Sequence, residues 1–171
     1  MTPPDEPLGL DGVNALSDRA REELLRKVCT SPAWVEGVAA GAPFGHAADL
    51  IARADRVLEE LSDTELDAAL AGHPRIGARA DNHASAREQS GVAGADAGVL
   101  ARLATGNRDY EERFGYVYLV CASGRSAEDL LAVLTERLAN DPATERAVMR
   151  AELGKINRLR LQRLLNEPEN A

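Results

Sequence analysis

Apolar residues recur along most of the chain at intervals of three or four, which is the spacing that places side chains on one face of an α-helix. In the first part of the chain, a serine that can cap a helix precedes three of these runs, at Ser17, Ser31 and Ser62. Glu65 follows Ser62 by three residues, as in a capping box. The pattern predicts short helices after Ser17 and Ser31, a longer helix over 50–61, and another that ends at Gly72.

The same spacing returns in the second half of the chain. It predicts a helix over 99–114, with Gly115 placed to end it. Ser126 is placed to cap a further helix, and a long helix is predicted over 142–164. The run VYLVCA at 117–122 is ambiguous: a single buried strand would have no partner, so we expect an extended connector or the start of a helix.

These patterns predict an all-α fold of roughly seven to nine helices. A length of 171 residues suits a single compact domain with a core of its own. Both ends of the chain are polar and carry little to bury, so residues 1–9 and 167–171 are predicted to be flexible tails. The helical domain is expected over 10–166.

Charge and composition exclude several classes of partner. The net charge is −8 and the basic residues do not cluster, which argues against nucleic acid. No apolar run is long enough to cross a bilayer, and the first residues lack the features of a signal peptide, so we expect a cytoplasmic protein without membrane contact. Cys29 and Cys121 are isolated, and reduced, packed thiols are expected rather than a disulfide.

The stretch HPRIGARADNHASAREQSG, at 73–91, interrupts the helical pattern. His73 follows Gly72 and precedes Pro74, which favours an extended or turn conformation that can direct an imidazole into a cavity. The alternative is a histidine that ends a helix or lies on a surface loop. Because imidazole titrates near neutrality, His73 is a candidate acid or base.

Glu88 and Gln89 lie near the end of this stretch. Residues 85–89 look like the first turn of a helix, where main-chain N–H groups face outward. Glu88 could orient and charge a histidine, and Gln89 could bind an amide-like ligand. The alternative is a solvated, acidic helix start.

Arg158, Arg160 and Arg163 alternate with leucines in the segment KINRLRLQRL. The ordinary interpretation is three exposed arginines on an amphipathic helix. Arg160 lies between two leucines, however, and could turn inward if an anion or carboxylate required it.

Signatures for nucleotides, flavins and zinc proteases are missing from the sequence. His73, Asp81 and His83 could be imagined as metal ligands, but they have neither the helical histidine spacing nor the cysteine pair of common zinc sites. We therefore expect no metal and no cofactor. Two alternatives stay open: a metal-dependent hydrolase that uses His73 and His83, and an acidic helical module that only binds a protein partner.

Four segments, in order, resemble the 2-oxo-4-hydroxy-4-carboxy-5-ureidoimidazoline (OHCU) decarboxylases of urate breakdown. They are HPRIG at 73–77, SAREQSG at 85–91, NRDYEERFGYVYLVCASGRS at 107–126 and KINRLRL at 155–161. The segments are weak signals singly and specific together, and the resemblance runs through almost the whole chain.

The resemblance implies an all-α, cofactor-free enzyme, usually a homodimer. Its small-molecule substrate is the unstable ureidoimidazoline released by hydroxyisourate hydrolase, and its products are (S)-allantoin and carbon dioxide. The resemblance places the proton donor on His73, a ligand contact on Pro74 and the family's arginine on Arg160. The two binding segments fall on Ser85, Ala86, Arg87, Glu88 and Gln89, and on the main chain of Tyr118, Leu119, Val120, Cys121 and Ala122.

The chemistry of such a substrate is consistent with a protein that has no cofactor. Loss of carbon dioxide leaves an electron pair on carbon, and the ring carbonyl and ring nitrogens of the substrate can accept it. The enzyme then has to orient the carboxylate and deliver a proton to one face. We expect His73 to give the proton, Glu88 to orient His73 and favour its protonated form, and Arg160 to bind an anionic or carbonyl oxygen.

Overall fold

The computed structural model describes residues 7–78 and 83–167. The secondary structure of these residues comprises nine α-helices and one short 3-10 helix, with no strand, which confirms the predicted all-α class. The chain forms two compact units within the length that predicted one domain. Residues 7–72 and 154–167 make the first unit, and residues 73–153, so far as they are described, make the second.

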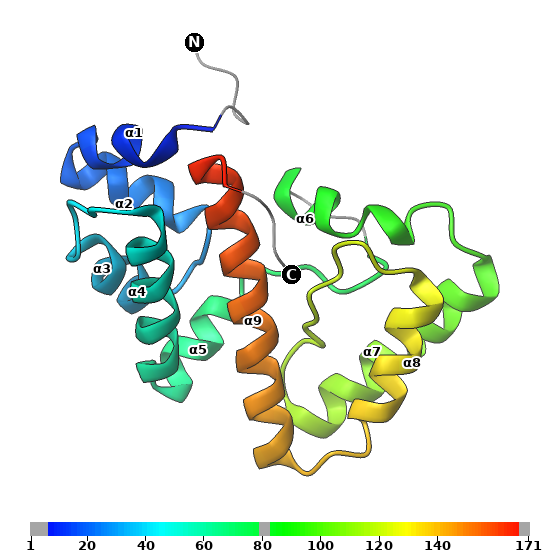
Figure 1. Cartoon of the computed structure of the whole chain (residues 1–171). Coiled ribbons are helices and arrows are strands. Elements are labelled where there is room, and N and C mark those ends of the chain that lie inside the picture. The colour runs from blue at the N-terminus through cyan, green and yellow to red at the C-terminus, as the bar shows by residue number, and fades with distance from the viewer. Residues whose placement is uncertain (1–6, 79–82, 168–171) are drawn as a thin grey trace. The chain divides into compact units, whose positions relative to one another are not determined.

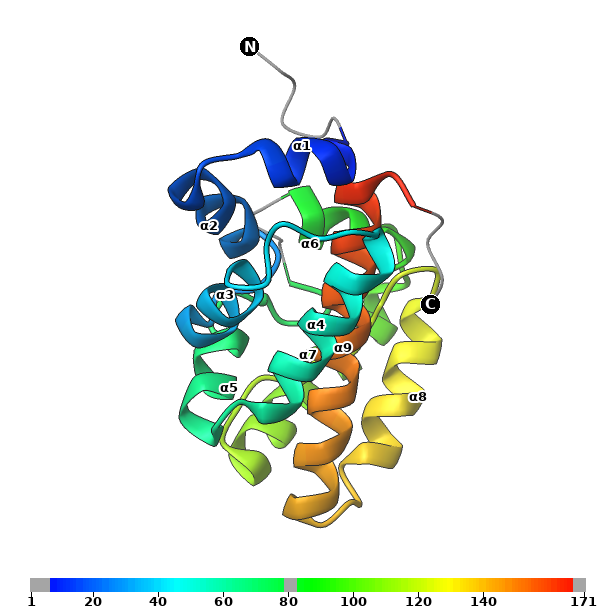
Figure 2. The same ribbon diagram turned by 60° about the vertical axis from the view of Figure 1, so that its left-hand side comes forward.

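The first unit contains five helices and the C-terminal part of a sixth. These are α1 (Gly9–Ala15), α2 (Asp18–Arg26), α3 (Pro32–Ala39), α4 (Ala47–Glu60), α5 (Asp63–Leu70) and, from Gly154 onward, α9 (Pro142–Leu165). Helix α3 lies next to α2, α4 and α5, as Figure 2 shows. Its fully buried Trp34 donates a hydrogen bond from the indole N–H to the Ala54 carbonyl at 3.2 Å, which joins α3 to α4.

Serine caps set the starts of three helices, as predicted. The Oγ atoms of Ser17, Ser31 and Ser62 accept hydrogen bonds from main-chain N–H groups in the first turns of α2, α3 and α5. The carboxylate of Glu65 accepts a hydrogen bond from the Ser31 hydroxyl at 3.1 Å. Glu65 therefore links the starts of α3 and α5 in addition to occupying the third position of α5.

Helix α1 was not predicted, and its contacts explain why. It is only seven residues long and contains one buried apolar side chain, Val13. Its C-terminal carbonyls are instead satisfied by Arg21 of α2, which donates to the carbonyls of Val13, Asn14 and Leu16. The stabilisation of α1 therefore comes from a residue of another helix. The sequence of α1 itself has no apolar periodicity from which a helix could be predicted. The predicted N-terminal tail over 1–9 also extends too far, because α1 begins at Gly9.

The second unit contains α6 (His83–Glu88), η1 (Ser90–Val92), α7 (Ala97–Phe114), α8 (Ala127–Arg137) and the first part of α9. Helices α7 and α8 pack side by side (Figure 1). A Cβ atom at Gly106 of α7 would lie 2.5 Å from Leu134 of α8, so glycine permits this close approach. Gly115, at a φ of 84°, ends α7 as predicted.

One prediction about this unit is wrong in detail. Residues 85–89 do not begin a helix, because α6 starts at His83 and ends at Glu88. The Gln89 N–H is already bonded to the Ser85 carbonyl at 3.0 Å, as expected one turn into a helix. The binding segment therefore lies along and after α6. It does not provide the unbonded main-chain N–H groups of a first helical turn. Residues 117–122 are the connector that was one of the two predicted alternatives.

Candidate active site

The loop that carries the candidate proton donor lies at the start of the second unit. His73 and Pro74 are both half-buried, and no regular helix includes residues 73–78. Gly77 has a φ of +85°, a conformation that glycine adopts without strain. His73 is therefore held by its position in a non-helical loop, as the sequence predicted.

Gln89 joins the two ends of the stretch that interrupted the helical pattern. Its side-chain oxygen accepts a hydrogen bond from the Gly77 N–H at 3.1 Å. The loop with His73 is thus connected directly to the residue that follows α6. With its oxygen engaged, the NH₂ group of Gln89 is the part of the amide suited to meet a ligand.

Helix α7 holds the same loop from another side. Asn107 donates from its side-chain amide to the Ile76 carbonyl at 2.9 Å. One turn further along α7, Glu111 accepts two hydrogen bonds from the guanidinium of Arg75, at 2.6 and 2.8 Å. These partners are four residues apart and share one helix face, so α7 serves as a rigid support for the loop.

Helix α6 turns one face inward. Ser85 and Glu88, three residues apart, are buried, whereas Ala86 and Arg87 between them are exposed. Among the five predicted binding residues, Ser85 and Glu88 are therefore shielded from solvent, and Ala86 and Arg87 face it. The burial of the Glu88 carboxylate contradicts the alternative of a solvated helix start, because a buried carboxylate is normally paired.

Residues after α6 pass close to the turn that follows the connector. A Cβ atom at Gly91 would lie 2.2 Å from the carbonyl oxygen of Arg125, so only glycine fits there without a shift. Ile76, Val92, Val120 and Ala122 belong to one buried hydrophobic cluster. The structure thus brings together, within the second unit, the HPRIG loop, the region that follows α6 and the connector.

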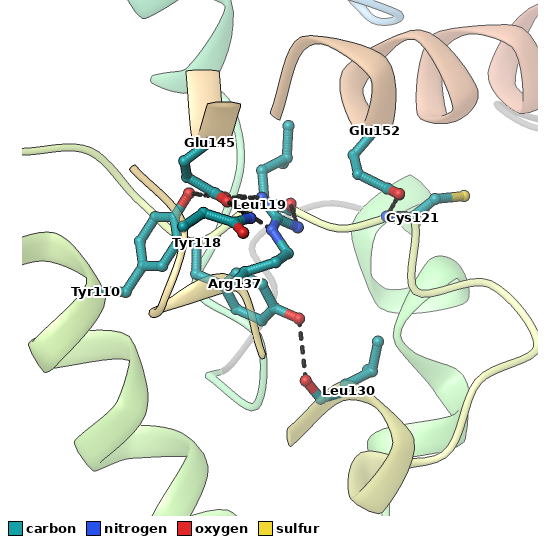
Figure 3. Close-up of polar contacts among 9 residues, drawn as sticks. Tyr110, Tyr118, Leu119, Cys121, Leu130, Arg137, Glu145 and Glu152 are labelled. Carbon is teal, nitrogen blue, oxygen red and sulfur yellow. Dashed lines mark hydrogen bonds and ion pairs between the residues drawn. The ribbon is translucent and has the colours of Figure 1, made fainter. Parts of the chain in front are cut away.

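The connector residues Tyr118, Leu119, Val120, Cys121 and Ala122 are all at least 93% buried, with Cys121 the most exposed at 7%. Two side chains hold their main chain (Figure 3). The guanidinium of Arg137 donates to the Leu119 carbonyl at 2.7 Å, and the carboxylate of Glu152 accepts from the Cys121 N–H at 2.8 Å. The main chain that the resemblance assigns to substrate is therefore fixed by residues that the resemblance did not name.

Arg137 belongs to a buried polar network that also contains Glu145 and Tyr110 (Figure 3). Its Nε donates to the Glu145 carboxylate at 2.7 Å, and the Tyr110 hydroxyl donates to the same oxygen. Burial, and then the hydrogen bond to Glu145, raise the pKa of Tyr110 far above its ordinary value. Burial likewise raises the pKa of Tyr118, whose ring lies 5.0 Å from the Arg137 guanidinium. Both phenols stay protonated at physiological pH and serve as hydrogen-bond donors.

Arg160 lies in the first unit, on α9. It is half-buried, and its Nη1 donates to the Val28 carbonyl at 3.0 Å. The neighbouring Arg158 forms an ion pair with Asp55 of α4 at 2.8 Å. Arg158, Arg160 and Arg163 are all half-buried, and the binding of an anion or a carbonyl oxygen by Arg160 stays a prediction.

The suggested metal ligands include positions that the structure does not fully describe. Asp81 lies outside the described residues, and only the backbone of His83 is described, at the start of α6. Across residues 7–78 and 83–167, no three histidine, cysteine, aspartate or glutamate side chains come together in a way that could hold a metal ion. In the same residues no helix is long and apolar enough to span a membrane.

The described residues define an all-α protein with a half-buried loop histidine, whose loop is held by Gln89 and by Asn107 and Glu111 of α7. The OHCU decarboxylase family model matches residues 14–162, and the chain belongs to this family. It is 32% identical over 164 residues to the 2-oxo-4-hydroxy-4-carboxy-5-ureidoimidazoline decarboxylase of Amia calva, covering 91% of this chain and 94% of that protein.

Two further similarities agree with this membership. The chain is 29% identical, over 154 residues, to the uric acid degradation bifunctional protein TTL of Arabidopsis thaliana, and the match spans about half of that longer protein (48%). Among solved structures it is similar to an OHCU decarboxylase crystallised in the presence of (S)-allantoin. That similarity has a TM-score of 0.77 at 25% identity and covers 89% of this chain and all of the other.

Proposed function

We propose that this protein catalyses the decarboxylation of OHCU to (S)-allantoin and carbon dioxide in the degradation of urate. Membership of the OHCU decarboxylase family over residues 14–162 carries this proposal. The relative from Amia calva, matched over nearly its full length, supports it. The hydrogen bond between Gly77 of the HPRIG loop and Gln89 after α6 also supports it, because it joins two of the segments proposed to form the site.

In the proposed reaction the bond between the ring carbon and the carboxylate breaks and carbon dioxide leaves. The electron pair of the broken bond moves toward a ring nitrogen, which leaves an enol between the former carboxyl-bearing carbon and its ureido-bearing neighbour. The His73 imidazolium transfers its proton to the ureido-bearing carbon, and the enol hydroxyl gives its proton to the ring nitrogen as its own carbon becomes the carbonyl of allantoin. The half-buried position of His73 suits this role, because a shielded donor delivers its proton to one face of the carbon. Delivery to one face accounts for a single enantiomer of the product.

The other residues bind and orient. Glu88, buried on α6, is assigned to hold the imidazole of His73, and the NH₂ group of Gln89 to bind a carbonyl of the substrate. Arg160 is assigned to an anionic or carbonyl oxygen. Main-chain groups of 118–122 are assigned to the ring and ureido amides. A metal or cofactor has no step in this proposal.

The decisive experiment generates the substrate in place, from urate with urate oxidase and hydroxyisourate hydrolase, and follows the circular dichroism of (S)-allantoin as it forms. We expect a strong acceleration that chelators do not abolish. Formation of racemic allantoin at the spontaneous rate, with folded protein present, would contradict the proposal. Loss of activity with a chelator, restored by a metal ion, would favour the metal-dependent alternative.

We also propose that the protein is a homodimer and acts in the cytoplasm. The resemblance to the family supports the dimer, and two buried thiols that are not joined to each other suit a reducing compartment. Size-exclusion chromatography with light scattering measures the molar mass of the protein in solution. A monomer at micromolar concentration would contradict the first proposal, and cell fractionation tests the second.

A further inference from the structure

Two charged side chains fix the main chain of the connector from one edge. Arg137 holds the Leu119 carbonyl and Glu152 holds the Cys121 N–H, at 2.7 and 2.8 Å (Figure 3). In an extended segment, the N–H and C=O groups of residues two apart point to the same edge, and those of the residue between them point to the opposite edge. Arg137 and Glu152 therefore occupy one edge and direct the main-chain groups of Val120 to the other.

Arg137 is itself held in one orientation. Glu145, which is fully buried, binds its Nε, and the rings of Tyr118 and Tyr110 lie 5.0 and 5.8 Å from its guanidinium. Asn140 donates to the second carboxylate oxygen of Glu145 at 3.0 Å. This arrangement leaves the guanidinium little freedom, so the position of the Leu119 carbonyl is well defined.

A buried ion pair contributes little net stability to a protein core. Replacing such a pair with apolar residues of similar volume is often neutral or stabilising, because desolvation offsets much of the attraction. What apolar residues cannot supply is a donor for the Leu119 carbonyl or an acceptor for the Cys121 N–H. The arrangement is therefore better explained by the geometry that it gives to the connector than by stability.

We propose that Arg137 and Glu152 are positioning residues that set the connector's ligand-facing edge and so orient the substrate for one-sided proton delivery. This inference rests on the proposed function, in which the main chain of 118–122 binds the substrate. Neither residue touches the reacting atoms. Their loss lowers kcat and the enantiomeric purity of the product more than it raises KM.

Glu152 offers the cleaner test, because it is half-buried and its replacement leaves the Arg137–Glu145 pair intact. Glu152→Gln keeps an oxygen that can accept from the Cys121 N–H, whereas Glu152→Leu does not. We expect Glu152→Leu to lower kcat by about 10²-fold, as displacements on the order of 1 Å do, and Glu152→Gln to retain most of the activity. Glu112→Leu, at an exposed position of α7, is the matched control.

Two readouts separate this proposal from a merely structural role and from the proposed function. The enantiomeric excess of allantoin falls in Glu152→Leu and is preserved in Glu152→Gln and the control. Hydrogen exchange of the Cys121 N–H, measured without substrate, accelerates in Glu152→Leu alone. An inactive wild-type protein with this exchange pattern would refute the proposed function while leaving the fixing of the connector established.

The proposal is overturned by either of two results. One is a folded Glu152→Leu protein with wild-type kcat, enantiomeric purity and exchange. The other is an equal loss of activity in Glu152→Gln and Glu152→Leu when only the latter shows faster exchange, because the hydrogen bond would then not be what catalysis requires.

Discussion

The side-chain oxygen of Gln89 accepts a hydrogen bond from the Gly77 N–H at 3.1 Å, and this bond connects the loop of His73 to the residue after α6. Gln89 therefore has two separable tasks. Its oxygen holds the loop, and its NH₂ group is the part assigned to the substrate.

Substitution of Gln89 should separate these tasks. Gln89→Glu keeps an acceptor for the Gly77 N–H and removes the NH₂ donor, so we expect a raised KM with little change in the exchange of the Gly77 N–H. Gln89→Leu removes both functions and should raise KM, lower kcat and accelerate that exchange. Steady-state kinetics and hydrogen exchange measure the two effects. Identical behaviour of the two variants would show that the NH₂ group has no separate role.

Replacement of His73 tests the proton donor. General acid catalysis typically accelerates a reaction by about 10²- to 10⁴-fold. The kcat of His73→Ala should therefore fall by a factor of at least this order, while its far-UV circular dichroism and thermal unfolding stay close to those of the wild type. His46→Ala is the matched control, because the side chain of His46 is 85% exposed at the start of α4. Wild-type turnover by His73→Ala would remove this residue from the mechanism.

The sequence predicted most helices correctly because their starts are encoded locally. Ser17, Ser31, Ser62 and Ser126 all cap the helices assigned to them. Gly77 of the HPRIG loop and Gln89 after α6, which lie in two segments that the resemblance assigned to one site, are joined by a hydrogen bond. Helix α1 could not be predicted, since its C-terminal carbonyls depend on Arg21 of another helix.

The residues that hold the site were missed, although a signal for some of them exists. Arg137 continues the buried spacing of Leu130 and Leu134 on α8, and Glu145 lies four residues before the fully buried Met149 on α9. A charged residue at a core position of a helix indicates a buried partner. Asn107 also lies at a core position, between Leu103 and Tyr110 on the buried face of α7, whereas Glu152 is half-buried and its partner is a main-chain group far away in the sequence.

Cys29 should be a poorly reactive thiol. Burial raises its pKa, against the opposing effect of a hydrogen bond from the Ser31 main chain. Since the thiolate is the reactive form, a thiol reagent at pH 8 should modify Cys29 much more slowly in the native protein than in urea. A Cys121→Ser variant isolates this thiol for the measurement. Rapid native modification would contradict the burial of Cys29.

The raised pKa of Cys29 also makes the stability of the fold depend on pH. A raised pKa in the folded state means that the folded protein binds the thiol proton more tightly than the unfolded chain does. The contribution of Cys29 is therefore complete below the ordinary thiol pKa and is lost as pH rises through the folded-state pKa. Unfolding in urea at pH 7 and pH 10 should show a smaller decline for Cys29→Ala than for wild type. An equal decline would show that this thiol does not contribute to the pH dependence.

Arg137 and Glu145 form a buried ion pair. Removing one partner leaves an uncompensated buried charge, so Glu145→Leu should lower the free energy of unfolding by about 3–5 kcal/mol. The double variant Arg137→Met with Glu145→Leu removes both charges and should recover much of that loss. Urea unfolding of the wild type, the single variants Arg137→Met and Glu145→Leu, and the double variant measures the coupling between the two sites. Recovered stability without recovered kcat would match a pair that serves geometry at the Leu119 carbonyl, whereas additive losses of stability would show that the two residues do not act as a pair.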